Sequence, residues 1–331
     1  MPDYYTPDPI WLTDLKIENQ DDYVKKYVIK GNFHSGVHED VINSFKTVEY
    51  LMAHAYYHWQ MYDQVLAKLL SIFEMAVKLR SKELDNPLQY QDRSDETKDK
   101  ELWRLIKELK NFGYPGFVIR DLHWLRKLRN QESHPDGHHF AGAIKKVAIM
   151  PGINIINRLF LDPNKLTLQI NNDTQMRRDK NIFSNNVFIH SYDGKKILVH
   201  GLEFLQNIEL ESTNCEYWKA NPILTDTYES FSRGSFGSPF RFFLTNVRIE
   251  NGNLLATDFH SNEFVTLYKA TDERSLQAYQ KHVEELERLE PIQKSAAESS
   301  YRHHLNSHLE EFVYINCWTS EQEIIPDSIN E

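Results

Sequence analysis

The hydrophobic side chains of residues 37–160 recur every three or four positions, which is the spacing of amphipathic helices. Residues 37–84 contain neither glycine nor proline, and they are too many for one ordinary globular helix. Two helices with a bend and one long bent helix both fit this stretch. A polar stretch at residues 82–100 predicts a solvated loop. Further helices are predicted at residues 102–109, at about 117–133, and at about 140–160 with an interruption at Pro151-Gly152.

The pattern changes to short strand-like pieces after about Leu161. These pieces alternate between apolar and polar positions or run apolar, and turn residues separate them. Asn251-Gly252 between two such runs is a strong hairpin signal, and Asp193-Gly194 marks a second turn. A small antiparallel sheet or barrel therefore fits this region. The strand-like pieces are residues 166–170, 187–190, 196–200, 204–210, 240–250 and 253–259.

These patterns predict an α+β protein with four parts. Residues 1–36, rich in Tyr, Pro and Asp, are expected to form an extended N-terminal arm. Residues 37–160 are expected to form an all-α four-helix bundle, and residues 161–270 a small antiparallel β domain. Residues 271–331 return to a helical pattern, with a break at Pro291 and an acidic tail.

The helix predicted at residues 117–133 carries a charge where its pattern asks for a core residue. An apolar stripe runs along it at spacings of four and three: Val118, Leu122 and Leu125. Arg129 occupies the next position on that stripe, so its charge must be paired or used on a ligand. Pro135 disfavours helical backbone at His134, and the helix is therefore predicted to end at this histidine.

Composition narrows the possible environments and partners. A net charge of −10 argues against a protein that coats nucleic acid non-specifically, although residues 116–150 are locally basic. No apolar run is long enough for a transmembrane helix, and the N-terminus is neither basic nor apolar as a secretory signal would be. Cys215 and Cys317 lie far apart, which suits a reducing interior. A cytoplasmic protein without a membrane partner is expected.

Arginine, asparagine and histidine close together can bind a phosphodiester and move a proton. The guanidinium of Arg129 would hold phosphate oxygens, and His134 would act as acid or base near neutral pH. Such chemistry requires no metal and no cofactor. The alternative is structural, with Arg129 paired to a carboxylate such as Glu49 or Glu74. Weaker candidates for substrate contacts are Arg126, Lys127, His138 and His139.

Other histidines give no stronger site. His54 and His58 have a spacing that can bind zinc on a helix, but no third ligand lies near them in the sequence. An aromatic-rich, partly buried face explains them more simply. A solvated helix face is the expected place of His303, His304 and His308. We expect no metal site.

The segment Arg129-Asn130-Gln131-Glu132-Ser133-His134 resembles the Arg-x4–6-His motif of the HEPN superfamily, in its Arg-Asn-x-x-x-His form. In that family the motif lies at the end of the third helix of a four-helix bundle, and the predicted helices of residues 38–160 have a matching order. No family is recognised for the β-rich half.

The resemblance implies a metal-independent endoribonuclease whose two motifs meet in a homodimer to form one composite site. Arg129 would contact the scissile phosphate, His134 would be the acid or base, and Asn130 would orient one of them. RNA is then the substrate, a toxin or anti-phage effector is the implied role, and an antitoxin or regulatory partner is possible. The alternative is a non-catalytic HEPN module for dimerisation or nucleotide sensing, with a ligand-binding β domain.

Overall fold

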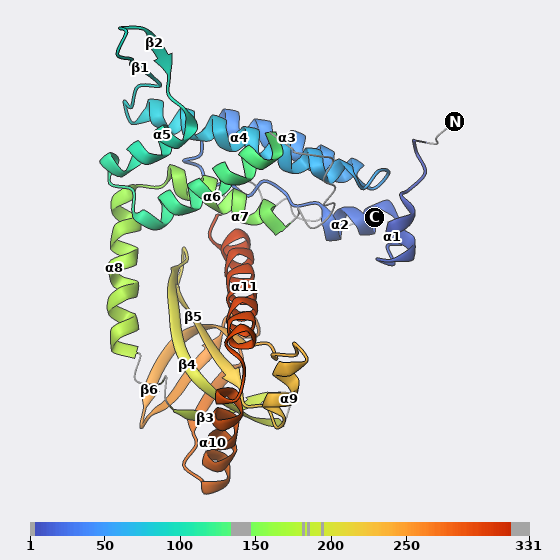
Figure 1. Cartoon of the computed structure of the whole chain (residues 1–331), viewed down its shortest axis with the longest axis vertical. Helices are drawn as coiled ribbons and strands as arrows, with labels where there is room; N and C mark the ends of the chain where they lie inside the picture. Colours follow the sequence, from blue (N-terminus) through green and yellow to red (C-terminus); the bar gives the residue numbers. More distant parts are fainter. Residues whose placement is uncertain (1–3, 134–146, 181–182, 184–185, 193–194, 319–331) are drawn as a thin grey trace, which may run out of the picture. The chain divides into compact units, whose positions relative to one another are not determined.

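The computed structural model describes residues 4–133, 147–180, 183, 186–192 and 195–318 of the chain. The chain divides into two compact units, which we call the helical unit and the barrel unit. The helical unit comprises Met1–Thr167 and Val313–Glu331, and the barrel unit comprises Leu168–Phe312. Helices and an antiparallel barrel thus occur in one chain (Figure 1), which confirms the predicted α+β class.

The N-terminal residues form two short helices, so the predicted extended arm is wrong. These are α1 (Pro9–Thr13) and α2 (Gln20–Tyr27). Asp8 caps α1 by accepting a hydrogen bond from the N–H of Ile10, and Pro9 suits its first turn because proline lacks an amide donor. Asn19 caps α2 in the same way. Trp11 and Tyr23 from these helices are fully buried, which attaches the segment to the core of the helical unit.

The stretch without glycine or proline forms two helices, α3 (Glu39–His54) and α4 (Met61–Glu83). Turn residues 55–60 separate them. α4 is central, because it packs against α3, α5, α6 and α7 (Figure 1). Its buried side chains lie at helical spacing and form much of the core; they include Leu69, Ile72, Phe73 and Ala76.

The remaining elements of this part surround α4. They are α5 (Leu102–Glu108), the 3-10 helix η1 (Leu109–Phe112), α6 (Gly116–Ser133) and α7 (Ile149–Phe160). The polar stretch predicted as a loop contains a two-stranded hairpin, β1 (Gln89–Gln91) and β2 (Thr97–Asp99). Gly152 allows α7 to approach α4, because a Cβ there would lie 2.9 Å from Leu69 Cδ2.

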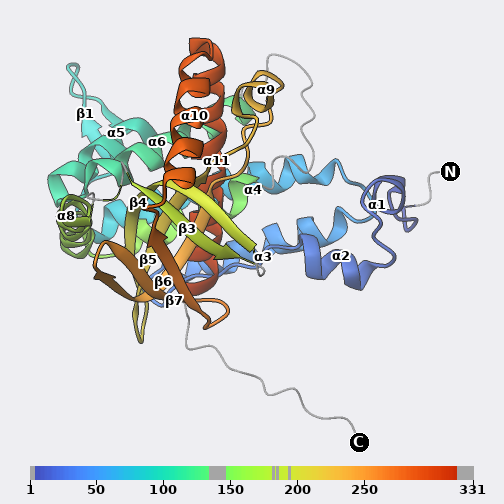
Figure 2. The ribbon, with the colours of Figure 1, turned by 90° about the horizontal axis from the view of Figure 1, so that it is seen from below.

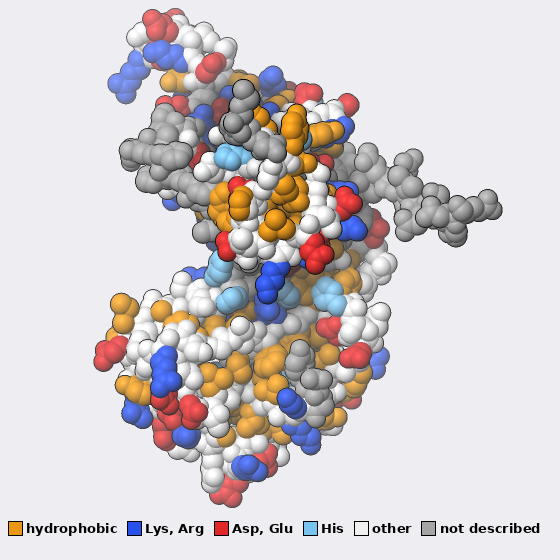
Figure 3. Space-filling model, turned by 90° about the vertical axis from the view of Figure 1, so that its right-hand side faces the viewer, with side chains coloured by type: hydrophobic (Ala, Val, Ile, Leu, Met, Phe, Trp, Pro, Cys, Tyr) orange, Lys and Arg blue, Asp and Glu red, His pale blue; other side chains and the backbone are white. Residues whose placement is uncertain are grey.

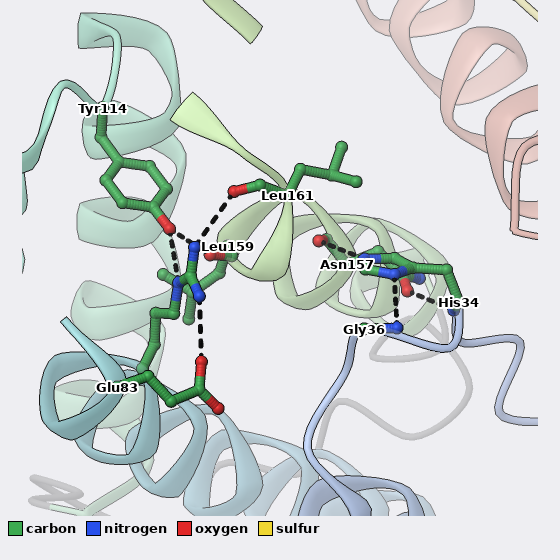
Figure 4. A network of polar contacts seen from close by, with 8 residues as sticks. His34, Gly36, Glu83, Tyr114, Asn157, Leu159 and Leu161 are labelled. Atoms are coloured by element: carbon green, nitrogen blue, oxygen red, sulfur yellow. Dashed lines mark hydrogen bonds and ion pairs between the residues drawn. The ribbon is translucent and has the colours of Figure 1, made fainter. Parts of the chain in front are cut away.

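Arg80 near the end of α4 connects the start of α6 with the end of α7. Figure 4 labels its partners Tyr114, Leu161 and Glu83. Arg80 Nε donates to the hydroxyl of Tyr114 at 2.8 Å, and Nη2 donates to the carbonyl of Leu161 at 3.3 Å. The Tyr114 hydroxyl in turn donates to the carbonyl of Leu159. These bonds join the residue just before α6 to the end of α7, and Glu83 balances the guanidinium at 2.9 Å. The positions of α6 and α7 against α4 are therefore fixed by polar contacts as well as by packing.

Residues 163–180 form helix α8 (Pro163–Lys180), so the strand predicted at 166–170 is wrong. The alternation of Leu166, Leu168 and Ile170 suggested a strand, but Leu168 is 61% exposed on the helix. Asp162 and Pro163 carry the overlooked signal. Asp162 accepts a hydrogen bond from the N–H of Asn164, and proline favours the first helical turn.

The barrel unit is a closed antiparallel barrel in which six strands pair in chain order, β3 to β8, and β8 returns to β3. Both predicted hairpins are present, since Tyr192 pairs with Lys195 and Glu250 pairs with Asn253. Asn251 and Gly252 both have positive φ, as a two-residue hairpin turn requires. The strands are β3 (Val187–Tyr192), β4 (Lys195–Glu209), β5 (Asn214–Pro222), β6 (Phe240–Glu250), β7 (Asn253–Asp258) and β8 (Phe264–Lys269).

β4 is one long strand where the sequence predicted two. Its register to β5 shifts between His200 and Glu203 and again between Phe204 and Gln206. Gly201 adopts φ +61° at the first shift, so the glycine produces a bulge rather than a turn. Such bulges redirect side chains without ending the strand.

Besides most of α8, the barrel unit contains the helices α9 (Thr227–Ser232), α10 (Glu273–Glu287) and α11 (Pro291–Asn316), whose last residues belong to the helical unit. α10 lies next to β3 (Figure 2). The barrel interior is apolar, with Phe188, Phe204 and Trp218 among its fully buried side chains. The predicted C-terminal helices therefore pack in the same unit as the strands over most of their length.

Candidate functional site

Arg129 lies on α6 and makes an ion pair with Glu74 of α4. Its Nη2 is 2.9 Å from Glu74 Oε2, and 34% of the Arg129 side chain remains exposed. Val118, Leu122 and Leu125 are buried, which confirms the predicted apolar stripe. The arginine therefore sits where the stripe reaches the surface. Pairing with Glu74 was one of the two predicted alternatives, whereas Glu49 instead accepts a hydrogen bond from the N–H of Gly31 at 2.6 Å.

Glu74 carries two cations at once. Besides Arg129, Lys78 one turn further along α4 donates to Glu74 Oε1 at 2.8 Å. Burial alone would raise the pKa of Glu74, but the hydrogen bonds and charges of Lys78 and Arg129 outweigh it and lower the pKa. Glu74 is therefore ionised at neutral pH. One carboxylate of α4 thus faces two cations, Arg129 and Lys78.

Asn130 is exposed and adjacent to the arginine. Its Oδ1 accepts a hydrogen bond of 3.4 Å from Arg129 Nη1, so the structure brings these two predicted site residues together. The described part of α6 ends at Ser133. His134, His138 and His139 lie outside the described residues.

Of the weaker candidates, Arg126 and Lys127 lie in the described part of α6. Each residue of an α-helix turns the chain by about 100°, so Lys127 lies roughly half a turn away from Arg129. Arg126 is closer in direction, but its Nε is directed at His123 Nδ1 at 3.3 Å. Lys127 therefore does not share the surface of the Arg129–Glu74 ion pair, whereas Arg126 lies three residues before Arg129 on a neighbouring part of the helix surface.

A shallow groove of about 480 Å³ lies on this other face of α6. Burial lowers the pKa of His123, and the neighbouring charges of Arg126, Lys110 and Lys127 lower it further. The groove is therefore cationic while its histidine stays neutral at neutral pH. The basic, aromatic and other residues that line it are Lys110, Gly116, Ile119, Arg120, His123, Trp124 and Lys127.

No cluster of three or more potential metal ligands exists among the described residues. His54 ends α3, and His58 lies in the following turn, so the two do not share a helix as predicted; both are exposed. His303 and His304 are exposed on α11, whereas His308 is partly buried against Tyr217 and Phe243. In the described part of the chain, no helix is long and apolar enough to span a membrane.

Sequence reasoning named Glu74 only as an alternative partner and gave no role to Lys78 or to the groove around His123. Glu74 and Lys78 are four residues apart on a helix, which was a usable signal for an ion pair. Lys110 belongs to η1 and reaches the groove only through the fold. No local spacing could have found that contribution.

Comparison with known protein families, curated proteins and solved structures found no match to this chain.

Proposed function

We propose that this chain is a metal-independent endoribonuclease of the HEPN type, with Arg129 and His134 as its central residues. One observation carries the proposal: Glu74 holds the Arg129 guanidinium at 2.9 Å while a third of the side chain stays exposed. A guanidinium that is fixed by one carboxylate and still open to solvent keeps donors free for a phosphate.

The chemistry follows from these groups. The ribose 2′-oxygen attacks the adjacent phosphorus, the P–O2′ bond forms and the P–O5′ bond breaks. Arg129 binds the non-bridging oxygens and stabilises their growing negative charge. His134 accepts the 2′-hydroxyl proton or gives a proton to the leaving 5′-oxygen. The products are a 2′,3′-cyclic phosphate and a 5′-hydroxyl.

A homodimer supplies what one copy lacks. A single histidine cannot conveniently serve as base and acid in the same turnover, and a two-fold axis would bring two copies of the motif together. The helices around α4 would then correspond to the four-helix bundle of the family, with the motif at the end of α6. Such an enzyme would cleave RNA in the cytoplasm. The role that fits it is that of a toxin or anti-phage effector, controlled by an antitoxin or another partner.

The experiment measures cleavage of a labelled RNA by the purified full chain in the presence of EDTA. Arg129→Ala and His134→Ala are each expected to slow cleavage by about a hundredfold or more, because each removes a group that acts in the transition state. Arg93→Ala is the matched control, since Arg93 is an exposed arginine of the β1–β2 turn, and it should cleave at the wild-type rate. Wild-type cleavage that survives both substitutions, or that EDTA abolishes, overturns the assignment.

The ion pair itself favours a second candidate, a non-catalytic HEPN module used for dimerisation. If Arg129 serves only to join α6 to α4, the wild type cleaves no RNA and Arg129→Ala lowers thermal stability. The proposed enzyme gives the opposite pattern, with lost cleavage and a small change in stability. Measuring both quantities on the same preparations separates the two functions.

A further inference from the structure

A cavity of about 670 Å³ lies in the barrel unit, outside the barrel wall. All the residues that line it belong to the barrel unit, and they come from α8, β4, β5, α9, α10 and α11. This volume is within the range of cavities that bind small molecules in proteins.

The strand β5 provides one wall through its outward-facing side chains. Tyr217, Lys219 and Asn221 line the cavity, whereas the alternate residues Trp218 and Ala220 belong to the barrel core. The wall and the core are thus the two faces of one strand.

The neighbouring strand β4 reaches the cavity because of its bulges. Leu205 and Gln206 are consecutive, and in a regular strand they would point to opposite faces, yet both line the cavity. The register shift between Phe204 and Gln206 accounts for this. His200, which pairs with Asn221 across the strands, lies beside the bulge at Gly201.

One face of α11 closes the opposite side. Its cavity residues recur every three or four positions, so they form a continuous stripe on the helix. The Tyr217 hydroxyl donates to the carbonyl of Leu305 at 3.0 Å and fixes this helix against β5. The stripe consists of Lys294, Ala297, Glu298, Tyr301, Arg302, Leu305, Asn306 and Leu309.

The charge around the cavity is positive although the whole chain has a net charge of −10. Lys219 is paired with Glu203 at 2.9 Å, but Arg302 makes no ion pair or hydrogen bond with any described residue. An exposed guanidinium that has no partner among the described residues can bind an anionic ligand at this cavity wall. The charged side chains that line the cavity are Arg177, Lys219, Lys294 and Arg302 against Glu298.

Two histidines contribute hydrogen bonding without a fixed charge. His200 Nε2 lies 3.2 Å from His282 Nε2, and Thr227 Oγ1 lies 2.6 Å from His282 Nδ1. Burial lowers the pKa of both imidazoles, which are therefore neutral at neutral pH. One imidazole must donate its Nε2 proton to the other, and Thr227 holds the orientation of His282.

The rest of the lining is apolar and aromatic. Phe231, Leu289 and Ala297 form a small buried cluster, and Leu286 and Tyr301 pack against it. In the lower part of Figure 3, hydrophobic side chains reach the surface of the barrel unit beside Lys and Arg side chains. A cavity with this lining offers one region for a flat apolar group and another for a negative charge.

We propose that this cavity binds a small aromatic anion of the nucleoside phosphate class. The base would lie against the aromatic and aliphatic side chains around Phe231 and Tyr301, and the phosphate would be bound by Arg302 and its basic neighbours. This site is separate from Arg129 and does not rest on the proposed nuclease activity.

The test is titration calorimetry of the full chain with AMP, GMP, CMP and UMP. At least one nucleotide is expected to bind with a Kd in the micromolar range. The matching nucleoside and inorganic phosphate are each expected to bind at least about tenfold more weakly, because each offers half of the ligand. Absence of nucleotide binding overturns the proposal. The proposal is also overturned if the nucleoside alone or phosphate alone binds as tightly as the nucleotide.

Two variants test the location of the site, and two others serve as controls. Arg302→Ala should weaken nucleotide binding about tenfold or more, and Asn306→Trp should abolish it by filling the cavity. Arg178→Ala is the matched control, since Arg178 is an exposed arginine that does not line the cavity. Arg129→Ala should also leave binding unchanged. Wild-type affinity in both Arg302→Ala and Asn306→Trp overturns the proposal, as does binding that is lost only in Arg129→Ala.

Discussion

The Arg129 site and the barrel cavity differ in how the chain builds them. Arg129 and Asn130 are neighbours on one helix, and Glu74 on one adjacent helix fixes the guanidinium. The cavity instead draws on elements between Arg177 and Leu309, and neutral histidines stand among its cations. The helical site is therefore a local, charged and partly exposed arrangement, whereas the cavity is a product of the whole barrel unit.

This difference predicts separate behaviour under acid, heat and mutation. In the helical unit, the ion pairs of Arg129 and Lys78 need the ionised carboxylate of Glu74, whose pKa is lowered. In the barrel unit, the cavity wall contains the imidazoles of His200 and His282, which burial keeps neutral. Changes at one site should therefore leave the chemistry of the other intact.

Acidification should destabilise the barrel unit first. Burial lowers the pKa of His200 to about 4, and the charges of His282 and Lys219 add to the effect, whereas an unfolded histidine titrates near 6.5. The unfolded chain therefore takes up the proton first, and stability falls as the pH decreases from about 6.5 to about 4. The loss from this residue is expected to be on the order of 1–3 kcal/mol. Tyr279 is a further ring in contact with His200.

Thermal unfolding at about pH 7 and about pH 5 measures this loss. His200→Asn should show a smaller decline than the wild type. Glu74 gives no comparable loss in that window, because its lowered pKa keeps it ionised until the pH falls below the usual value of a glutamate. Equal declines in wild type and His200→Asn would contradict this account of the cavity.

Glu74→Gln should reduce RNA cleavage about tenfold, equivalent to about 1.4 kcal/mol. The amide can still accept a hydrogen bond from Arg129 but no longer offers a charge, so the guanidinium is held less firmly. As Glu74 acts through Arg129, kcat should fall with little change in KM. In addition, Glu74→Gln combined with Arg129→Ala should be no slower than Arg129→Ala alone. Additive losses in the double variant would show that Glu74 acts independently of the arginine.

Gly201→Ala should destabilise the barrel unit by about 1 kcal/mol or more, because alanine tolerates a positive φ poorly. The new Cβ would also lie 3.2 Å from Asn221 Nδ2, at the cavity wall. We expect weaker nucleotide binding and unchanged RNA cleavage. Gly116→Ala is the control in the helical unit, since its Cβ would meet no atom within 4 Å. Urea unfolding measures the free energy of unfolding of both variants. Equal values for Gly201→Ala and Gly116→Ala would argue against strain at the bulge.

Lys78→Ala should have the smallest effect, about 0.3–0.5 kcal/mol of stability at most. Lys78 is 46% exposed, and its pair with Glu74 is one of ordinary helical spacing. Cleavage should change less than about twofold, because Arg129 retains Glu74. A loss as large as that of Glu74→Gln would indicate that the lysine itself contacts the substrate.

Local patterns predicted the elements whose signal lies in neighbouring residues. The stripe of α6 and the Asn251-Gly252 hairpin are confirmed for this reason. The strand predicted at residues 166–170 is wrong because apolar alternation has less weight there than the helix-start signal Asp162-Pro163. The helices α1 and α2 were missed in the same way, although Asp8 and Asn19 provide ordinary caps.

Contacts between distant segments had no such signal. The strands β5 and β8 and the closure of β3 on β8 depend on pairing that no short window contains. His200 and His282 are far apart in sequence and meet only because α10 packs beside the strands. The Arg129–Glu74 pair could be anticipated because both lie on predicted apolar helices, but the choice of Glu74 over Glu49 required the fold.

The most direct test of the central claim is the chemical nature of the RNA ends produced in EDTA by the wild type and by Arg129→Ala. We predict that the wild type leaves 2′,3′-cyclic phosphate and 5′-hydroxyl ends, and that Arg129→Ala leaves almost none in the same time. Products with 3′-hydroxyl and 5′-phosphate ends, or equal cleavage by Arg129→Ala, would contradict the proposed role of the arginine at the end of α6.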